Sequence, residues 1–407
     1  MTTFAPVGDL LAFAVGGGWG DEEVSSETVA CRVVRGTDLA TARHGSLDGV
    51  PLRYETPKRL ASRTLDAGDL ILEISGGSKG QPTGRTALVT QRLLDRSQYP
   101  VIPASFCRLL RPDQSRVQSR YLYYWMQEMY SSGRVWAYQN QSTGIANFQM
   151  KVFTRAEMVR LPPLEEQERI AGVLGAFDDL IETNRRLIAG LDDLFQTLWR
   201  QDYDSRSNAR RQTLAAVAST QYGLTASASD DPTGVKFLRV TDINKQNWIN
   251  WEGVPTVPIS EVQGHKYRLA VGDLLVARMA DPGKSAIYEG GPDAVFASYL
   301  VRLKPDSYED GLYLYGFLKS DEYAVYAAGA MTGSVQKNMN AKVISAATLH
   351  WPDEEARRAF AEKVAPIRRA QSALLTEATE LARRRDELLP LLMSGKVRVR
   401  DVEGAVL

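Results

Sequence analysis

Two stretches of the chain carry apolar residues at alternating steps of four and three, which is typical of helices that pair along a seam. The first follows Leu161-Pro162-Pro163-Leu164, and Glu165 and Glu166 place negative charge in its first turn, where the helix dipole favours it. We predict a helix from Glu165 to Arg200, about 50 Å long at ~1.5 Å per residue. With Asn184 completing the spacing, its apolar seam is Ile170, Leu174, Phe177, Ile181, Ile188, Leu191, Phe195 and Leu198.

The second stretch opens at Trp351-Pro352-Asp353-Glu354-Glu355 and predicts another long helix. Pro366 lies inside it and should kink the helix or delay its regular part, because proline removes a backbone donor. Gly395 is a suitable C-terminal stop. The seam runs through Phe360, Val364, Ile367, Gln371, Leu374, Ala378, Leu381, Arg385, Leu388 and Leu392.

Three polar residues, Asn184, Gln371 and Arg385, occupy core positions of these seams. Such residues lower stability but fix register and partner, so we expect the two helices to pair with each other. The alternative is that each helix packs on its own domain and its polar positions reach solvent. Paired antiparallel as a coiled coil, the helices would hold two globular domains at opposite ends of a rod, related by a pseudo-two-fold axis.

The globular segments are two versions of one sequence, separated by roughly 190 to 205 residues, which is far longer than solenoid or propeller periods. The motifs keep their order, so we predict a duplicated module of domain size. The matched stretches are 35–39 and 239–243, 67–71 and 271–275, 104–112 and 297–305, 121–123 and 313–315, 143–144 and 332–333, and 163–166 and 352–355.

The sequence of each globular half predicts a mixed, strand-rich structure, so we expect an α+β fold. We predict strands over 70–75, 235–240 and 271–279, and a short helix over 121–130 whose aromatic residues are more typical of a core than of a base-stacking platform. The predicted divisions are a first domain 1–160, a helical region 161–205, a second domain 206–350, a helical region 351–400 and a tail 401–407.

Composition narrows the class of protein without identifying it. Hydrophobic residues make up 44% and charged residues 24% of the chain, and the formal net charge is zero. A neutral chain is not a general polyanion binder, although a local basic groove remains compatible with it. Cys31 and Cys107 have no metal or disulfide spacing, and the three histidines suggest no metal site or triad. No apolar run approaches the ~18 residues of a membrane span, and residues 1–9 lack signal-peptide features, so we predict a cytoplasmic protein.

Several of these stretches resemble the specificity subunit of type I restriction–modification systems. Residues 161–184, from Leu-Pro-Pro-Leu-Glu-Glu-Gln-Glu-Arg-Ile to Asp-Asp-Leu-Ile-Glu-Thr-Asn, are similar to the first central helix of that family. Residues 388–397, Leu-Leu-Pro-Leu-Leu-Met-Ser-Gly-Lys-Val, are similar to its C-terminal end. Residues 68–85 and 272–285 look like parts of its two target-recognition domains. The resemblance covers essentially the whole chain.

The resemblance implies a non-catalytic subunit that binds double-stranded DNA. Each recognition domain would read one half of a bipartite target, and the helices would set the unread spacer. Two methyltransferase subunits would dock on the helices, and ATP-dependent restriction subunits would join them. This chain would bind no cofactor or metal itself, with S-adenosylmethionine, ATP and Mg²⁺ held by the partner subunits. The second helix departs from the family by opening with residues 351–357, Trp-Pro-Asp-Glu-Glu-Ala-Arg, instead of the Pro-Leu-x-Glu-Gln form.

Two rival functions stay open. One is an enzyme, a methyltransferase or nuclease with its own recognition domains. A DNA amino-methyltransferase needs an Asn/Asp-Pro-Pro-aromatic loop to hold its base, but Leu161 precedes Pro162-Pro163 here, so we predict no catalytic residue. The other rival is a recognition scaffold of a different phage-defence complex.

Candidate DNA contacts are side-chain donors in loops, since base edges are read by Arg, Lys, Asn and Gln and phosphates accept from any donor. The glycine-rich loop of the first half and the equivalent loop of the second supply one set, and a turn in the second half supplies another. The candidates are Ser78, Lys79, Gln81, Thr83, Arg85, Asn244, Lys245, Asn247, Arg278, Lys284 and Ser285. A solvated hairpin loop or turn is the alternative explanation for each.

Large apolar residues outside the seam of the first helix exceed what a two-helix pair can bury. Such excess marks a partner-docking surface, unless these residues pack on the chain's own domains. They are Leu180, Leu187, Leu194 and Trp199.

Overall fold

The computed structural model describes residues 2–77, 80–141, 146–229, 231, 234–251, 253–331 and 338–399. It divides the chain into two compact units, one made of Met1–Thr183 with Ala378–Leu407 and the other of Asn184–Glu377. The candidates Ser78 and Lys79, the repeated pairs 143–144 and 332–333, and the tail 401–407 lie outside the described residues.

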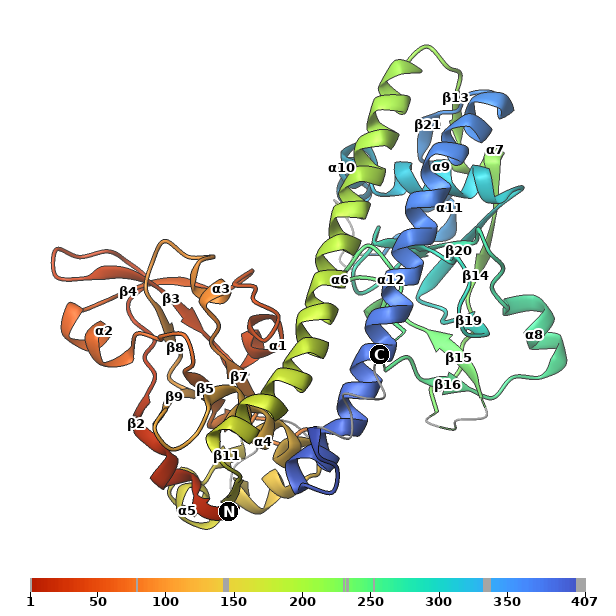
Figure 1. Ribbon diagram of the computed structural model, residues 1–407. Helices are drawn as coiled ribbons and strands as arrows, with labels where there is room; N and C mark the ends of the chain where they lie inside the picture. The colour runs from red at the N-terminus through yellow and green to blue at the C-terminus, as the bar shows by residue number, and fades with distance from the viewer. Residues whose placement is uncertain are drawn as a thin grey trace. The chain divides into compact units, whose positions relative to one another are not determined.

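The described residues of the first unit form four sheets, whose strands can be followed in Figure 1. A four-stranded antiparallel sheet has the order β2 (Leu11–Gly16), β9 (Cys107–Pro112), β5 (Leu70–Glu73), β7 (Thr86–Leu88). In the second, β3 (Val29–Val34) pairs antiparallel with β4 (Leu52–Glu55) and parallel with β8 (Val101–Pro103). The smaller sheets are β10 (Gln139–Gln141), β11 (Ala146–Phe148), β6 (Ser75–Gly76), and β1 (Thr3–Pro6), β12 (Met158–Leu161).

Strand β5 is buried on both faces, which explains its continuous apolar run. Leu70 and Leu72 point into a core that contains the aromatic helix α4 (Ser119–Ser131), whereas Ile71 points into a second core beneath the β3–β8 sheet. Tyr121 is fully buried, so the prediction of an aromatic core helix is confirmed. The remaining short helices are α1 (Leu39–Ala42), α2 (Pro57–Arg63), α3 (Gln91–Leu94), α5 (Met150–Ala156) and the 3-10 turns η1 (Val7–Leu10), η2 (Gly36–Asp38) and η3 (Arg134–Tyr138).

The second unit repeats this topology. Its four-stranded antiparallel sheet has the order β14 (Ala218–Tyr222), β20 (Leu300–Pro305), β17 (Leu274–Ala277), β18 (Ser285–Ile287). Strand β15 (Val235–Leu238) pairs antiparallel with β16 (Thr256–Val257) and parallel with β19 (Ala294–Phe296), and β13 (Arg211–Thr213) pairs with β21 (Thr348–His350). The helices are α7 (Leu214–Val217), α8 (Glu261–Tyr267), α9 (Tyr308–Leu318), α10 (Asp321–Ala330), α11 (Ala341–Ala346) and the 3-10 turn η4 (Val240–Asp242).

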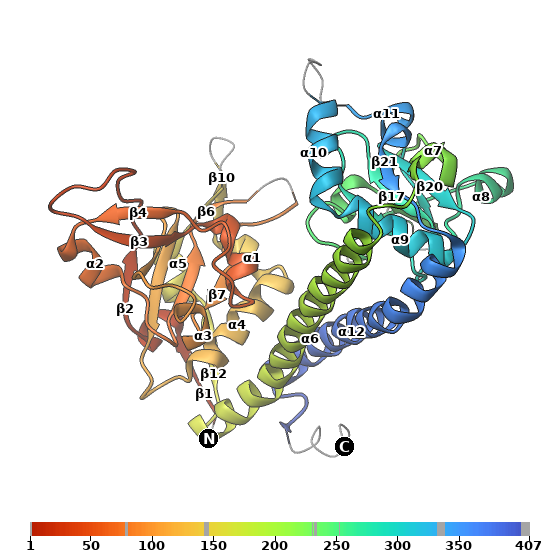
Figure 2. The same cartoon turned by 90° about the horizontal axis from the view of Figure 1, so that it is seen from above.

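The repeated sheet order confirms the α+β class and the duplication. Strand β17 also alternates between two cores, with Leu274 and Val276 in one and Leu275 and Ala277 in the other. Figure 2 shows α9 lying between the four-stranded sheet of this unit and the long helices. Residues of α9, of that sheet and of both long helices belong to one hydrophobic core.

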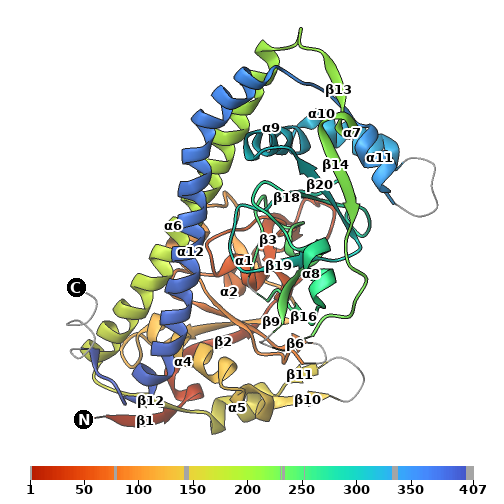
Figure 3. The ribbon, with the colours of Figure 1, turned by 90° about the vertical axis from the view of Figure 1, so that its right-hand side faces the viewer.

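The two long helices are α6 (Leu164–Ser205) and α12 (Glu354–Ser394), and they lie side by side in Figures 1 and 3. In the first unit, the beginning of α6 packs against the end of α12, with Leu174 and Leu392 in one core. In the second unit, the end of α6 packs against the beginning of α12, with Phe195 and Phe360 in one core. The pairing is therefore antiparallel, as predicted.

Two of the three polar seam residues hydrogen-bond to the partner helix, and the third is buried. Gln371 is 1% exposed and donates through Nε2 to the carbonyl oxygen of Ile188 at 3.2 Å. Arg385 donates to Asp178 Oδ1 at 2.6 Å, and Asn184 is buried. Helix α12 already begins at Glu354, so Pro366 does not delay it.

Candidate nucleic-acid interface

In the first unit, the loop from β5 to β7 is bounded by an ion pair. Glu73 ends β5 and is 2% exposed, and its backbone N–H donates to the carbonyl oxygen of Arg85 at 2.9 Å. The Arg85 guanidinium donates to both carboxylate oxygens of Glu73, at 2.9 and 2.6 Å. These hydrogen bonds raise the pKa of Arg85. A bidentate pair of this kind neutralises the positive charge that we predicted for DNA contact.

Two further candidates on this loop have different surroundings. Gln81 is exposed, and its side chain forms a hydrogen bond with Tyr130. Thr83 is fully buried, and its backbone N–H donates to Gln139 Oε1 at 3.0 Å. The prediction that Thr83 contacts DNA is therefore wrong, because its side chain lies inside the domain.

In the second unit, the loop from β17 to β18 is shorter. The guanidinium of Arg278 lies 5.0 Å from the ring centroid of Tyr222, which is a cation–π contact. Lys284, directly before β18, is exposed. Ser285 is 1% exposed and its hydroxyl donates to the carbonyl oxygen of Leu318 at 3.4 Å, so the prediction that it contacts DNA is also wrong.

The turn 244–247 lies beside this loop. Asn244 donates to Asp281 Oδ2 at 3.3 Å, which ties the turn to the loop. Lys245 is exposed. Asn247 is exposed as well, but its amide donates to Asp192 Oδ2 on α6 at 2.6 Å. The structure therefore brings together the two donor sets that the sequence suggested for the second domain.

A cavity of about 250 Å³ opens between this loop and one face of α10. Its described lining contains two ammonium groups, from Lys284 and Lys319, and no carboxylate. The small side chains of Ala324, Ala327 and Ala328 form the helical wall. A cavity with this lining favours an anion.

Lys319 is held in a partly desolvated position at this cavity. Its ammonium donates to the carbonyl oxygen of Ser285 at 2.5 Å and lies 5.4 Å from the ring centroid of Tyr315. Burial lowers its pKa to about 8, while the Asp192 carboxylate opposes that shift and the Lys284 and Arg368 cations add to it. Near neutral pH Lys319 therefore remains mostly charged.

The lowered pKa of Lys319 predicts a pH-dependent stability. An unfolded Lys319 keeps its proton up to its ordinary pKa of 10.5, whereas the folded chain releases it near 8. Between these values the unfolded state binds more protons, so this contribution to the free energy of unfolding rises with pH. Relative to Lys319→Met, the wild type should gain roughly 1 to 3 kcal/mol between pH 8 and pH 10.5. Urea unfolding of both proteins across this window measures the difference, and parallel profiles would contradict the prediction.

A buried ion network lies where α6, α12 and the second domain meet, and sequence reasoning missed it. Arg368 of α12 is 2% exposed and donates to the carboxylate of Glu289 at 2.5 to 3.1 Å. Its guanidinium also lies 3.7 Å from Asp192 of α6 and over the rings of Phe195 and Tyr315. Burial raises the pKa of Asp192, and the Arg368 cation opposes that rise. No sequence signal marked Arg368, because it falls outside the apolar seam.

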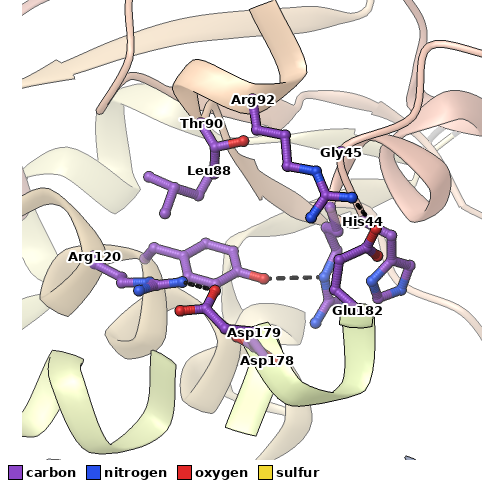
Figure 4. Close-up of a pocket in the computed structure, with 11 residues that line it drawn as sticks. His44, Gly45, Leu88, Thr90, Arg92, Arg120, Asp178, Asp179 and Glu182 are labelled. Carbon is purple, nitrogen blue, oxygen red and sulfur yellow. Dashed lines mark hydrogen bonds and ion pairs between the residues drawn. The ribbon is translucent and has the colours of Figure 1, made fainter. Parts of the chain in front are cut away.

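In the first unit, charged side chains join the globular part to α6 around a cavity of about 150 Å³ (Figure 4). Figure 4 shows the two ion pairs that reach α6, Arg120–Asp179 and Arg92–Glu182, with donor–acceptor distances of 2.9 and 2.8 Å. Arg43 donates to the Tyr123 hydroxyl of α4 at 3.0 Å. None of the predicted DNA-contact residues lines this cavity. Since each of these three arginines has a partner, we interpret the cavity as a structural junction and not as a ligand site.

The predicted partner-docking residues separate into two groups. Leu180, Leu187 and Leu194 are 49%, 50% and 45% exposed, and seven-residue spacing places them on one face of α6. Trp199 is only 3% exposed, and its indole N–H donates to the carbonyl oxygen of Tyr313 at 3.0 Å. Assigning Trp199 to a docking surface was wrong, because it packs on α9, where Gly316 leaves room for its ring.

The described residues offer little other chemistry. No group of three or more His, Cys, Asp or Glu side chains among them could hold a metal ion. Burial raises the pKa of the Cys31 and Cys107 thiols to about 11 and about 12, which keeps them protonated and unreactive near neutral pH. In the described part of the chain, every helix is too short or too polar to cross a membrane.

Comparison with known proteins gives concordant matches. Residues 57–192 match the family described as type I restriction modification DNA specificity domain. The type I restriction enzyme MjaVIII specificity subunit of Methanocaldococcus jannaschii is 24% identical over 298 residues, which cover 65% of this chain and 67% of that protein. The crystal structure of the type I restriction–modification S subunit from M. genitalium covers 96% of both chains with a TM-score of 0.55 and 13% identity, so it supports the fold alone.

Proposed function

Because this chain belongs to the specificity subunits of type I restriction–modification systems, we propose that each of its two domains reads one half of a bipartite DNA target. The chain is the DNA specificity subunit of such a system and a non-catalytic component of the enzyme. The observation that carries the proposal is the repeated topology. Two domains with the same sheet order and the same parallel and antiparallel pairings present equivalent loops, as two similar readers of DNA require.

The long helices are the proposed docking surface for two methyltransferase subunits. The exposed leucines 180, 187 and 194 of α6 supply an apolar stripe on a helix whose opposite face is already buried. We also propose that α6 and α12 set the unread spacer of the target. In this proposal the partner subunits, including the restriction subunits, hold S-adenosylmethionine, ATP and Mg²⁺, and the complex acts on double-stranded DNA in the cytoplasm.

An exchange of one domain tests the proposal. Residues 1–160 of the chain would be replaced by the first domain of another specificity subunit, within the complete system in cells. Since each domain reads its own half-site, one half of the methylated sequence should change while the other half and the spacer stay the same. Sequencing that maps methylated bases across the genome measures both halves.

The reciprocal exchange of residues 206–350 is the matched control and should change only the other half-site. A single exchange that alters both halves, or neither, would contradict the assignment of one half-site to each domain.

A further inference from the structure

The two domains differ at one buried position next to the candidate DNA loops. Glu73 is the last residue of β5 and Ala277 is the last residue of β17. In both domains the backbone N–H of this residue donates to the carbonyl oxygen of the residue before the next strand. The acceptor is Arg85 at 2.9 Å in the first domain and Lys284 at 2.7 Å in the second. The same backbone bond makes Arg85 and Lys284 structural counterparts, as it does Glu73 and Ala277.

The surroundings of this position have changed together with it. Gly36 and Gly76 leave space for the carboxylate of Glu73, because a Cβ added at either glycine would lie 2.6 Å from Oε1. In the repeated motif, the counterpart of Gly36 is Val240, which is 5% exposed and belongs to the same apolar core as Ala277. The second domain thus fills with an apolar side chain the volume that a carboxylate occupies in the first.

The loss of the carboxylate leaves a cation without its partner. Arg85 is held by two hydrogen bonds to Glu73, so its charge is neutralised within the protein. Lys284 is exposed and forms no ion pair with any residue in the described part of the chain. It lines the cavity that it shares with Lys319, where the described lining contains no carboxylate.

We propose that Lys284, supported by the charge of Lys319, binds a backbone phosphate of DNA. The first domain lacks an equivalent contact, because the guanidinium of Arg85 is already paired with the carboxylate of Glu73. Lysine suits this role, since its ammonium binds phosphate as a point charge and carries no base preference. The inference rests on the proposed DNA-binding function and adds an asymmetry between the domains. The second domain holds its half-site with one more phosphate contact from this loop position than the first.

The salt dependence of binding tests this asymmetry directly. The probe is a fluorescent mixed-sequence DNA duplex, titrated at several salt concentrations with the full chain in complex with its modification subunits. Each neutralised phosphate contributes about 0.9 to the slope of log K against log salt. Lys284→Gln should therefore reduce the magnitude of that slope by about 1. The control Lys304→Gln, at an exposed lysine at the opposite end of the same sheet, should leave the slope unchanged.

A second pair of variants keeps both cations and changes only their availability. Val240→Gly with Ala277→Glu rebuilds the first-domain arrangement in the second domain. The introduced carboxylate should then pair with Lys284 and reduce the magnitude of the slope by about 1. Gly36→Val with Glu73→Ala should release Arg85 and increase the magnitude of the slope by a similar amount.

The results distinguish a failure of the proposed DNA-binding function from a failure of the Lys284 phosphate contact. A wild-type complex that does not bind the duplex would overturn the proposed function together with this inference. A wild-type complex that binds with a steep salt dependence, while Lys284→Gln shows the same slope as Lys304→Gln, would overturn this inference alone.

Discussion

Replacing Arg368 with Met should lower the free energy of unfolding by roughly 3 to 5 kcal/mol, the cost of removing one partner from a buried ion network. The guanidinium is 2% exposed and pairs with Glu289, whose side chain is 16% exposed, and it lies near Asp192, which is 3% exposed. Without Arg368, two carboxylates with little access to water would lose their nearest cation. Urea unfolding followed by near-ultraviolet circular dichroism measures the loss.

Two controls separate this mechanism from a general effect of losing an arginine. Arg383→Met removes an arginine of the same helix whose side chain is 55% exposed, and it should leave the unfolding midpoint nearly unchanged. Adding Glu289→Gln to Arg368→Met should recover part of the lost stability, because it removes one uncompensated charge. If Arg368→Met and Arg383→Met unfolded at the same urea concentration, the buried ion network would not stabilise the fold as predicted.

Gly223→Ala should destabilise the second domain by roughly 3 kcal/mol, at the upper end of the usual cost of overpacking. An added Cβ would lie against two backbone carbonyl groups, 2.5 Å from the oxygen of Phe296 and in contact with the oxygen of Ala297. Backbone atoms cannot rotate away as a side chain can, so the strand would have to shift. The counterpart Gly17 meets the carbonyl groups of Pro103 and Ala104 in the same way, and Gly17→Ala should have a similar effect on the first domain.

Gly190→Ala is the matched control for both glycine variants. Nothing lies within 4 Å of a Cβ added at Gly190, which is exposed in the interior of α6. This substitution should stabilise the helix by roughly 0.5 to 1 kcal/mol, because alanine loses less backbone entropy. Thermal unfolding of the variants should therefore shift in opposite directions, and a stabilised Gly223→Ala would refute the close approach.

Much of the architecture was predictable because helical periodicity and internal repetition are local properties of a sequence. The predicted helix Glu165–Arg200 lies within α6, and the predicted stop at Gly395 directly follows α12. Strand β5 begins at the predicted Leu70, but the predicted strand breaks after Glu73 and pairing resumes in β6. Such breaks depend on partner strands, which a local pattern does not contain.

Side-chain partners were harder to predict, even where the sequence repeats. Arg35 pairs with Asp38 and Arg239 with Asp242, so this repeated motif keeps its partners. The repeated aspartates 69 and 273 do not, since Asp69 pairs with Arg111 and Asp273 with Arg302, two positions that are not counterparts in the repeat.

The candidate site shows the same division between local and tertiary information. The loops were located correctly, but Thr83 and Ser285 are buried, because a donor in a predicted loop still points inward or outward according to strand register. Trp199 was placed on the wrong surface, since only the tertiary structure brings Gly316 of α9 beneath its ring.

The paired differences at positions 36 and 73 also constrain how these domains can exchange pieces during evolution. A crossover between the two sites would combine a valine with a buried glutamate, which clashes, or a glycine with an alanine, which leaves a void. Either recombinant would fold less well than both parents. Genetic exchange that preserves folding should therefore keep these two positions together, with breakpoints outside the stretch between them.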